Sequence, residues 1–143
     1  MQEKTKKRRT VFLVLTVLIL LLIWGQSALP VRFSAAESGW LRETVVNPLL
    51  ALFGLGPVRE QVLRKAAHVT EFFLFSLAAG LFWRGKLPRT LLTAFLAAFL
   101  DETIQIFSGR GAQVRDVWID LAGAAAGSLL GWLIMRRKRG KTK

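Results

Sequence analysis

Long runs of apolar residues recur four times along the chain, at residues 11–29, 66–83, 90–107 and 117–135. A helix needs about 20 residues to cross the hydrocarbon core of a bilayer, with about 17 as a practical minimum. Each run reaches that minimum, and more polar segments separate the runs. The pattern therefore predicts an all-α integral membrane bundle of four transmembrane helices.

The connection between the first and second runs, residues 30–65, is the longest in the chain. It carries apolar patches at residues 40–41 and 45–55, which Pro48 and Gly54 interrupt. Short apolar stretches of this kind are typical of helices that lie in the membrane interface. We therefore expect short interfacial helices in this first outer connection.

Composition supports the membrane class. Hydrophobic residues make up 52 % of the 143 positions. With the glycines added, the apolar share reaches about 60 %, against roughly 45–50 % in globular domains. A soluble domain of this size lacks the interior to bury so many apolar side chains. The chain has no cysteine, which excludes disulfide bonds, thiolate metal ligands and a thiol nucleophile.

Positive charge is concentrated at the two ends of the chain. The net charge is +12, and 14 of the 21 Lys and Arg residues lie in residues 1–10, 84–89 and 136–143. Because cytoplasmic segments of membrane proteins carry the excess of Lys and Arg, we expect both termini in the cytoplasm. The chain thus divides into a basic tail 1–10, one membrane domain 11–135 and a basic tail 136–143. No basic face with readout residues lies between the apolar runs, which argues against nucleic acid as a partner.

Ionisable residues inside the last three runs lie at one depth. Such a residue costs roughly 2.5–3.5 kcal/mol near the centre of a spanning helix, so each requires a reason. Along each helix they are spaced to share a face, and each lies within about 9 Å of the outer end at 1.5 Å per residue. We therefore predict an outward-facing polar pocket formed by Lys65, His68, Glu71, Asp101, Glu102, Gln105, Arg110, Asp116 and Asp120.

Several uses of these side chains stay open at the level of the sequence. Oxygen-rich sites suit Mg²⁺ or Ca²⁺, and a histidine with carboxylates suits Zn²⁺, so a divalent cation is one candidate cofactor. The carboxylates also offer general acid and base groups, but no activated nucleophile stands beside them and no catalytic residue is assigned. Arg110 and Arg115 above the carboxylates suit an anionic headgroup or phosphate. Alternatively, the charged groups pair with one another and only hold the helices together.

Three glycines repeat every four residues on the last helix, at Gly123, Gly127 and Gly131. Small residues at this spacing let two helix backbones approach closely. We expect a packing seam inside the bundle, with formation of a homo-oligomer as the alternative.

The polar positions also form an ordered set of motifs, namely Lys65-x-x-His68-x-x-Glu71-Phe72, Asp101-Glu102-x-x-Gln105-x-Phe107, Arg110 and Asp116-x-x-x-Asp120-x-x-Gly123-x-x-x-Gly127. Over about residues 58–135 this set resembles the VanZ-like family of bacterial membrane proteins. The resemblance implies a multi-pass protein of the bacterial cytoplasmic membrane. The founding member of that family is associated with low-level resistance to the glycopeptide antibiotic teicoplanin, so the resemblance also points to the cell envelope.

These observations lead to one main functional hypothesis and two alternatives. The main hypothesis is that the pocket binds a membrane lipid or cell-envelope headgroup, such as that of a lipid-linked envelope precursor, with or without a divalent cation. The first alternative is an intramembrane hydrolase or transferase that uses a carboxylate as base on a lipid-linked substrate. The second is a purely structural membrane partner. The sequence does not decide between an enzyme and a binding protein.

Overall fold

Four long helices dominate the structure, a computed structural model that describes residues 2–30, 38–109 and 113–140. They are α1 (Gln2–Ala28), α4 (Glu60–Phe82), α5 (Leu87–Phe107) and α6 (Val114–Gly140). Within the described residues there is no strand, which agrees with the predicted all-α class. The helices extend the predicted apolar runs mainly at their charged ends, because a helix continues beyond the hydrophobic stretch when its ends can be solvated.

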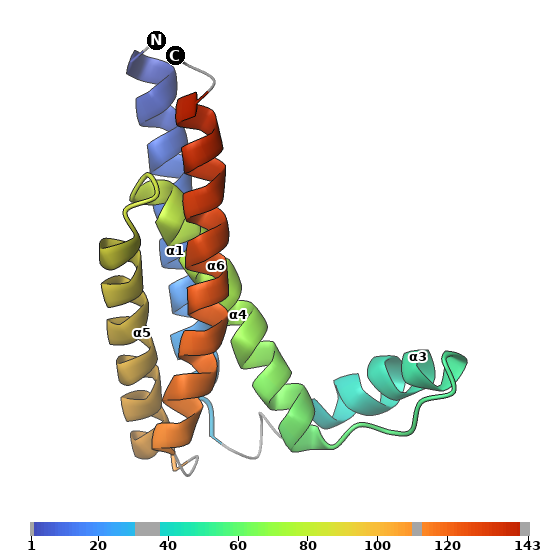
Figure 1. Ribbon diagram of the computed structural model, residues 1–143. Helices are drawn as coiled ribbons and strands as arrows, with labels where there is room; N and C mark the ends of the chain where they lie inside the picture. Colours follow the sequence, from blue (N-terminus) through green and yellow to red (C-terminus); the bar gives the residue numbers. More distant parts are fainter. Residues whose placement is uncertain (1, 31–37, 110–112, 141–143) are drawn as a thin grey trace.

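The four long helices run alternately up and down in one bundle, and both chain termini lie at the same end (Figure 1). Helix α4 contacts all three of the others and packs most extensively against α6. The buried core includes Phe72 and Phe75 of α4, Ile23 of α1 and Ala98 of α5. Helix α1 is also fixed to α5 by the Trp24 indole, whose Nε1 donates to the Ala97 carbonyl at 3.2 Å. Because the helices alternate in direction, the start of α4, the end of α5 and the start of α6 lie together at the end of the bundle away from the termini.

The close packing of α4 on α6 depends on the glycine repeat of α6. A Cβ at Gly123 would overlap the Val69 carbonyl, and one at Gly127 would overlap the Phe73 carbonyl. Farther along, a Cβ at Gly131 would lie 3.4 Å from the Gly80 Cα. The two backbones thus touch along the glycine face, which is the close approach that small residues permit.

A tight reversal joins α4 to α5 at the end nearer the termini. Arg84 and Gly85 both adopt positive φ, at 56° and 74°. Glycine adopts positive φ without steric strain, because it has no Cβ. A Cβ on Gly85 would also lie only 2.9 Å from the Met135 Cβ of α6. The reversal needs only a few residues and places α5 antiparallel to α4.

Within the described residues, three helices are long and apolar enough to cross a membrane, over Lys6–Ala28, Leu87–Phe107 and Val114–Lys138. They correspond to the first, third and fourth predicted spans. The second predicted span, residues 66–83, lies in α4, which has 23 residues but is not among these three. Its first half carries Lys65, His68 and Glu71, which lower its hydropathy. Of the four predicted spans, three are thus clear among residues 2–30, 38–109 and 113–140, and the second is not.

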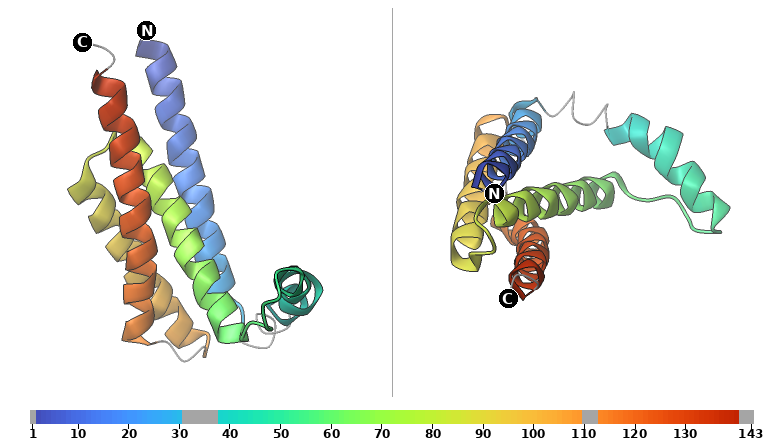
Figure 2. Two further views of the ribbon diagram at one scale, coloured as in Figure 1. Left: turned by 45° about the vertical axis from the view of Figure 1, so that its right-hand side comes forward. Right: turned by 90° about the horizontal axis from the view of Figure 1, so that it is seen from above.

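The first outer connection is helical in its described part and projects sideways from the bundle (Figure 2). A helical turn at residues 38–41 continues into a wider turn, η1 (Arg42–Val46), and then into α3 (Asn47–Leu52). Large apolar side chains stand exposed along it, with Leu52 80 % and Phe53 79 % accessible. Short helices thus exist where they were predicted, and their position at the membrane interface stays a prediction.

Candidate functional site

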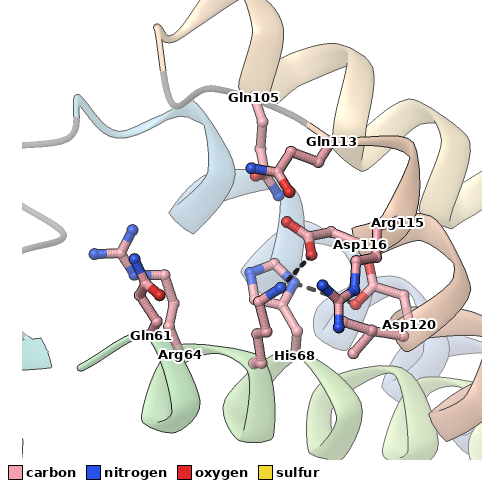
Figure 3. A pocket seen from close by; sticks show the side chains of 10 residues that line it. Gln61, Arg64, His68, Gln105, Gln113, Arg115, Asp116 and Asp120 are labelled. Carbon is pink, nitrogen blue, oxygen red and sulfur yellow. Dashed lines mark hydrogen bonds and ion pairs between the residues drawn. The ribbon is translucent and has the colours of Figure 1, made fainter. Parts of the chain in front are cut away.

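A polar cavity of about 330 Å³ opens at the end of the bundle away from the termini (Figure 3). Helices α4 and α6 supply most of its wall, and α5 contributes one side chain. The lining residues are Gln61, Arg64, Lys65, His68, Gln105, Gln113, Arg115, Asp116, Ile119 and Asp120.

A histidine of the cavity wall lies close to two buried carboxylates, one of which also lines the cavity. The Nδ1 of His68 lies 3.5 Å from Asp120 Oδ1 and 3.8 Å from Asp101 Oδ2. Asp101 is fully buried and Asp120 is 1 % exposed, whereas His68 is half-buried. Three different helices supply these residues, so the bundle itself creates the cluster. We call these three residues the His68 cluster.

A polar chain links the His68 cluster to α1. Gln105 Nε2 donates to Asp101 Oδ2 at 2.7 Å and lies 3.4 Å from Ser27 Oγ. Ser108 Oγ donates to the Ser27 carbonyl at 2.8 Å. Asp101 and Gln105 are four residues apart and therefore neighbours on one face of α5. This chain orients the Asp101 carboxylate and ties the end of α5 to the end of α1.

Glu102 has a different role from its neighbour Asp101. Its Oε1 accepts a short hydrogen bond from the backbone N–H of Gln113, the residue before α6 begins. An acceptor at this place satisfies one of the backbone donors that a helix start leaves open. Its Oε2 is buried and has no hydrogen-bond partner in the part of the chain that the structure describes. Glu102 therefore holds the start of α6 against α5.

Cationic side chains surround the mouth of the cavity. Lys65 Nζ lies 2.7 Å from Asp116 Oδ1, Arg64 lies 2.6 Å from Glu60 Oε1, and Arg115 lines the wall. Glu60 also accepts from Ser38 Oγ at 3.0 Å. These two hydrogen bonds lower the pKa of the Glu60 carboxyl below its usual 4.5, and the bond from Ser38 has the larger effect. Two of the three cations at the mouth are therefore paired with carboxylates, Arg64 with Glu60 and Lys65 with Asp116.

The structure brings together most of the nine residues predicted for the pocket. Five line the cavity, and they are Lys65, His68, Gln105, Asp116 and Asp120. Asp101 lies behind His68, as its 3.8 Å contact shows. Glu71 and Glu102 do not line the cavity. Arg110 lies outside the described residues, so the structure places no side chain for it.

Five lining residues were outside the predicted set, and they are Gln61, Arg64, Gln113, Arg115 and Ile119. Gln61 and Arg64 come from the first turns of α4, before the predicted apolar run begins. Gln61 lies four residues from Lys65, so the i,i+4 spacing of a helix extended toward the amino end would have found it. Gln113 and Ile119 carry no charge pattern that marks them in the sequence.

The arrangement can do two things chemically. The His68 cluster presents one imidazole nitrogen and two carboxylates whose ligand atoms all lie within 4.8 Å of one another, a donor set that suits a divalent cation. The guanidinium and ammonium groups at the mouth suit a phosphate or another anion. Both features share one cavity in a bundle of apolar helices, which defines a membrane protein with a polar pocket at one end.

Comparison with known proteins identifies the family. The family model VanZ/LLP1 matches residues 12–135, and the chain belongs to this family. A curated relative, described as "Uncharacterized membrane protein YwnJ" from Bacillus subtilis (strain 168), is 31 % identical over 84 residues, which are 57 % of this chain and 56 % of the relative. The chain thus aligns with a little over half of that protein. No solved structure matches. The predicted resemblance to VanZ-like proteins is confirmed, and with it a place in the membrane.

Proposed function

We propose that this protein binds the anionic headgroup of a lipid or lipid-linked envelope molecule in the cavity at the end of the bundle away from the termini. The observation that carries the proposal is that three cationic side chains line the cavity, namely Arg64, Lys65 and Arg115. Arginine holds phosphate through two parallel N–H donors, and lysine adds a point charge.

The size and position of the cavity favour a headgroup over a whole lipid. A volume of about 330 Å³ lies at the lower end of the roughly 300–1,000 Å³ found for small-molecule sites. Exposed apolar side chains on the outer faces of α5 and α6, such as Leu96 and Leu129, face the region where acyl chains lie in a membrane. A headgroup in the cavity leaves its acyl chains against these surfaces.

The proposal includes the membrane topology predicted from charge. Helix α4 also crosses the membrane, as the second of four spans along the chain, with its polar first half at the outer interface and its apolar second half, which contains the buried Phe72 and Phe75, in the hydrocarbon. The basic tails then lie in the cytoplasm, because Lys and Arg are retained there. The short helices at residues 38–52 rest on the outer surface, since their exposed apolar side chains gain from partial burial.

Lipid analysis in native membrane nanodiscs tests the headgroup proposal. Wild-type protein is compared with the double variant Arg64→Ala/Arg115→Ala and with the matched control Arg89→Ala/Arg136→Ala. The control removes two arginines that stack on Trp83 and Trp132. We expect the first variant to lose at least half of its enrichment of anionic or pyrophosphate-linked lipid while the control keeps it. Equal enrichment in all three proteins would overturn the proposal.

Membership of the VanZ/LLP1 family supports a readout in cells. We expect expression of the wild-type chain in a susceptible bacterium to raise the inhibitory concentration of teicoplanin. The Arg64→Ala/Arg115→Ala variant should lose this effect at equal membrane abundance, because the headgroup is then no longer held. An unchanged inhibitory concentration with wild-type protein would show that the chain does not share the association of the family's founding member with teicoplanin resistance.

A further inference from the structure

We propose that the His68 cluster, made of His68, Asp101 and Asp120, binds one divalent transition-metal ion, either Zn²⁺ or Mn²⁺. The inference goes beyond headgroup binding and does not require it, because the three ligands are distinct from the cations at the mouth: His68 and Asp120 line the cavity, and Asp101 lies behind His68. It rests on the spacing of the three ligand atoms, on their burial and on their charge.

The spacing fits a shared ion better than a direct hydrogen bond. A charged imidazole and a carboxylate approach to about 2.7–2.9 Å when they form a hydrogen bond. His68 Nδ1 instead lies 3.5 Å from Asp120 Oδ1 and 3.8 Å from Asp101 Oδ2. Bonds of about 2.0 Å from a tetrahedral zinc ion set neighbouring ligand atoms about 3.3 Å apart. Small side-chain rotations would therefore close the three atoms around one ion.

The burial of Asp120 supplies an independent reason for a cation. Its side chain is 2 % exposed, and its Oδ2 has no hydrogen-bond partner among residues 2–30, 38–109 and 113–140. A buried carboxylate oxygen without a partner is costly, and an ion bound by that carboxylate would offset the cost. Two ionised carboxylates, a neutral imidazole and a divalent ion together carry no net charge, which suits the apolar core beneath them.

A residue next to the His68 cluster makes a hydrogen bond that would orient one of the metal ligands. Gln105 Nε2 donates to Asp101 Oδ2 at 2.7 Å, which fixes the orientation of that carboxylate. Such outer contacts are a regular feature of metal sites in proteins. One nitrogen with two carboxylates favours Zn²⁺ or Mn²⁺, because imidazole suits the first and oxygen ligands suit the second. The cavity provides room for water or a ligand oxygen to complete the coordination.

Metal analysis of the full chain tests this inference separately from headgroup binding. The protein is purified in detergent without added phospholipid, stripped with a chelator, and equilibrated with Zn²⁺ or Mn²⁺ alone. We expect about one ion per chain in the wild type and at least a tenfold loss of affinity in His68→Gln and Asp120→Asn. The matched control Glu43→Gln keeps the ion, because Glu43 lies outside the cavity and is paired with Arg42.

A second measurement covers the case in which a variant fails to fold. Co²⁺ added to stripped wild-type protein should give a visible d–d absorption that saturates near one equivalent and is displaced by Zn²⁺. The absence of a saturable signal, the absence of bound ion in the wild type, or retention of the ion in folded His68→Gln and Asp120→Asn would each overturn the proposal. None of these results depends on whether a lipid occupies the cavity.

Discussion

Lys65 of α4 and Asp116 of α6 meet across the mouth of the cavity, with 2.7 Å between Nζ and Oδ1. They are 51 residues apart in the chain, so the pair joins two helices at the point where a ligand would enter. The Lys65 side chain is 41 % exposed and that of Asp116 is 32 % exposed. Solvent therefore screens the attraction between them, and an anionic ligand can compete with Asp116 for the lysine.

Removal of this pair should affect ligand binding more than stability. Exposed ion pairs contribute about 0–1 kcal/mol, so we expect Lys65→Met to change the free energy of unfolding by less than about 1 kcal/mol. The same variant should lose anionic lipid in nanodiscs, because a cation leaves the mouth. Arg42→Met is the matched control, since it breaks a pair with Glu43 outside the cavity. A large loss of stability in Lys65→Met with lipid retained would instead mark the pair as structural.

The glycine face of α6 should resist even the smallest side chain. Alanine at Gly123 or Gly127 places a Cβ against a backbone carbonyl of α4, and a backbone cannot move as a side chain can. Overpacking of this kind costs roughly 1–3 kcal/mol. We therefore expect lower midpoints of thermal unfolding in detergent for Gly123→Ala and Gly127→Ala. Gly25→Ala on α1 should have no such effect, because no atom lies within 4 Å of its added Cβ.

The proposed four-span topology can be tested with single cysteines, because the chain has none of its own. We introduce Leu55→Cys, Arg84→Cys or Gly140→Cys and label intact cells with a membrane-impermeant thiol reagent. If α4 spans the membrane, only the cysteine at position 55 is labelled before the cells are permeabilised. Labelling at position 84 from outside would show that α4 does not cross, and the polar first half of α4 would then need another location.

The attachment of the short helices to the bundle should depend on pH through Glu60. Ser38 and Arg64 lower the pKa of this carboxyl, so its contribution to attachment is present above pH 4.5 and is lost as the pH falls through the lower pKa of the folded state. We expect lower hydrogen-exchange protection factors, which correct for the pH dependence of intrinsic exchange, in residues 38–52 on acidification below pH 4.5. Glu60→Gln should have low protection factors at both pH values, and a pH effect on protection that persists in this variant would rule out Glu60 as its source.

Five of the nine residues predicted for the pocket line the cavity, whereas the long helices extend beyond the predicted apolar runs. Helical spacing alone put His68, Asp101 and Asp120 on inward faces at one depth, because the period of a helix fixes which residues share a face. It did not reveal Ser27 on α1, since a small hydroxyl at the end of an apolar run carries no signal of its own. Nor did it reveal Gln113, which reaches the cavity only through the approach of α5 to α6. Helix α4 is less clearly apolar than the other three long helices, because its first half carries Lys65, His68 and Glu71, of which the first two line the cavity.

The His68 cluster draws its side chains unequally from the bundle. His68 and Asp120 belong to the two helices whose backbones touch along the glycine face, whereas Asp101 belongs to α5, which packs less extensively. Any sliding of α5 along its neighbours would therefore change the separation of Asp101 from the other two before it disturbed them. The distance of Asp101 from the other two side chains therefore depends on the register of α5. An ion or ligand that binds all three side chains would fix α5 relative to α4 and α6.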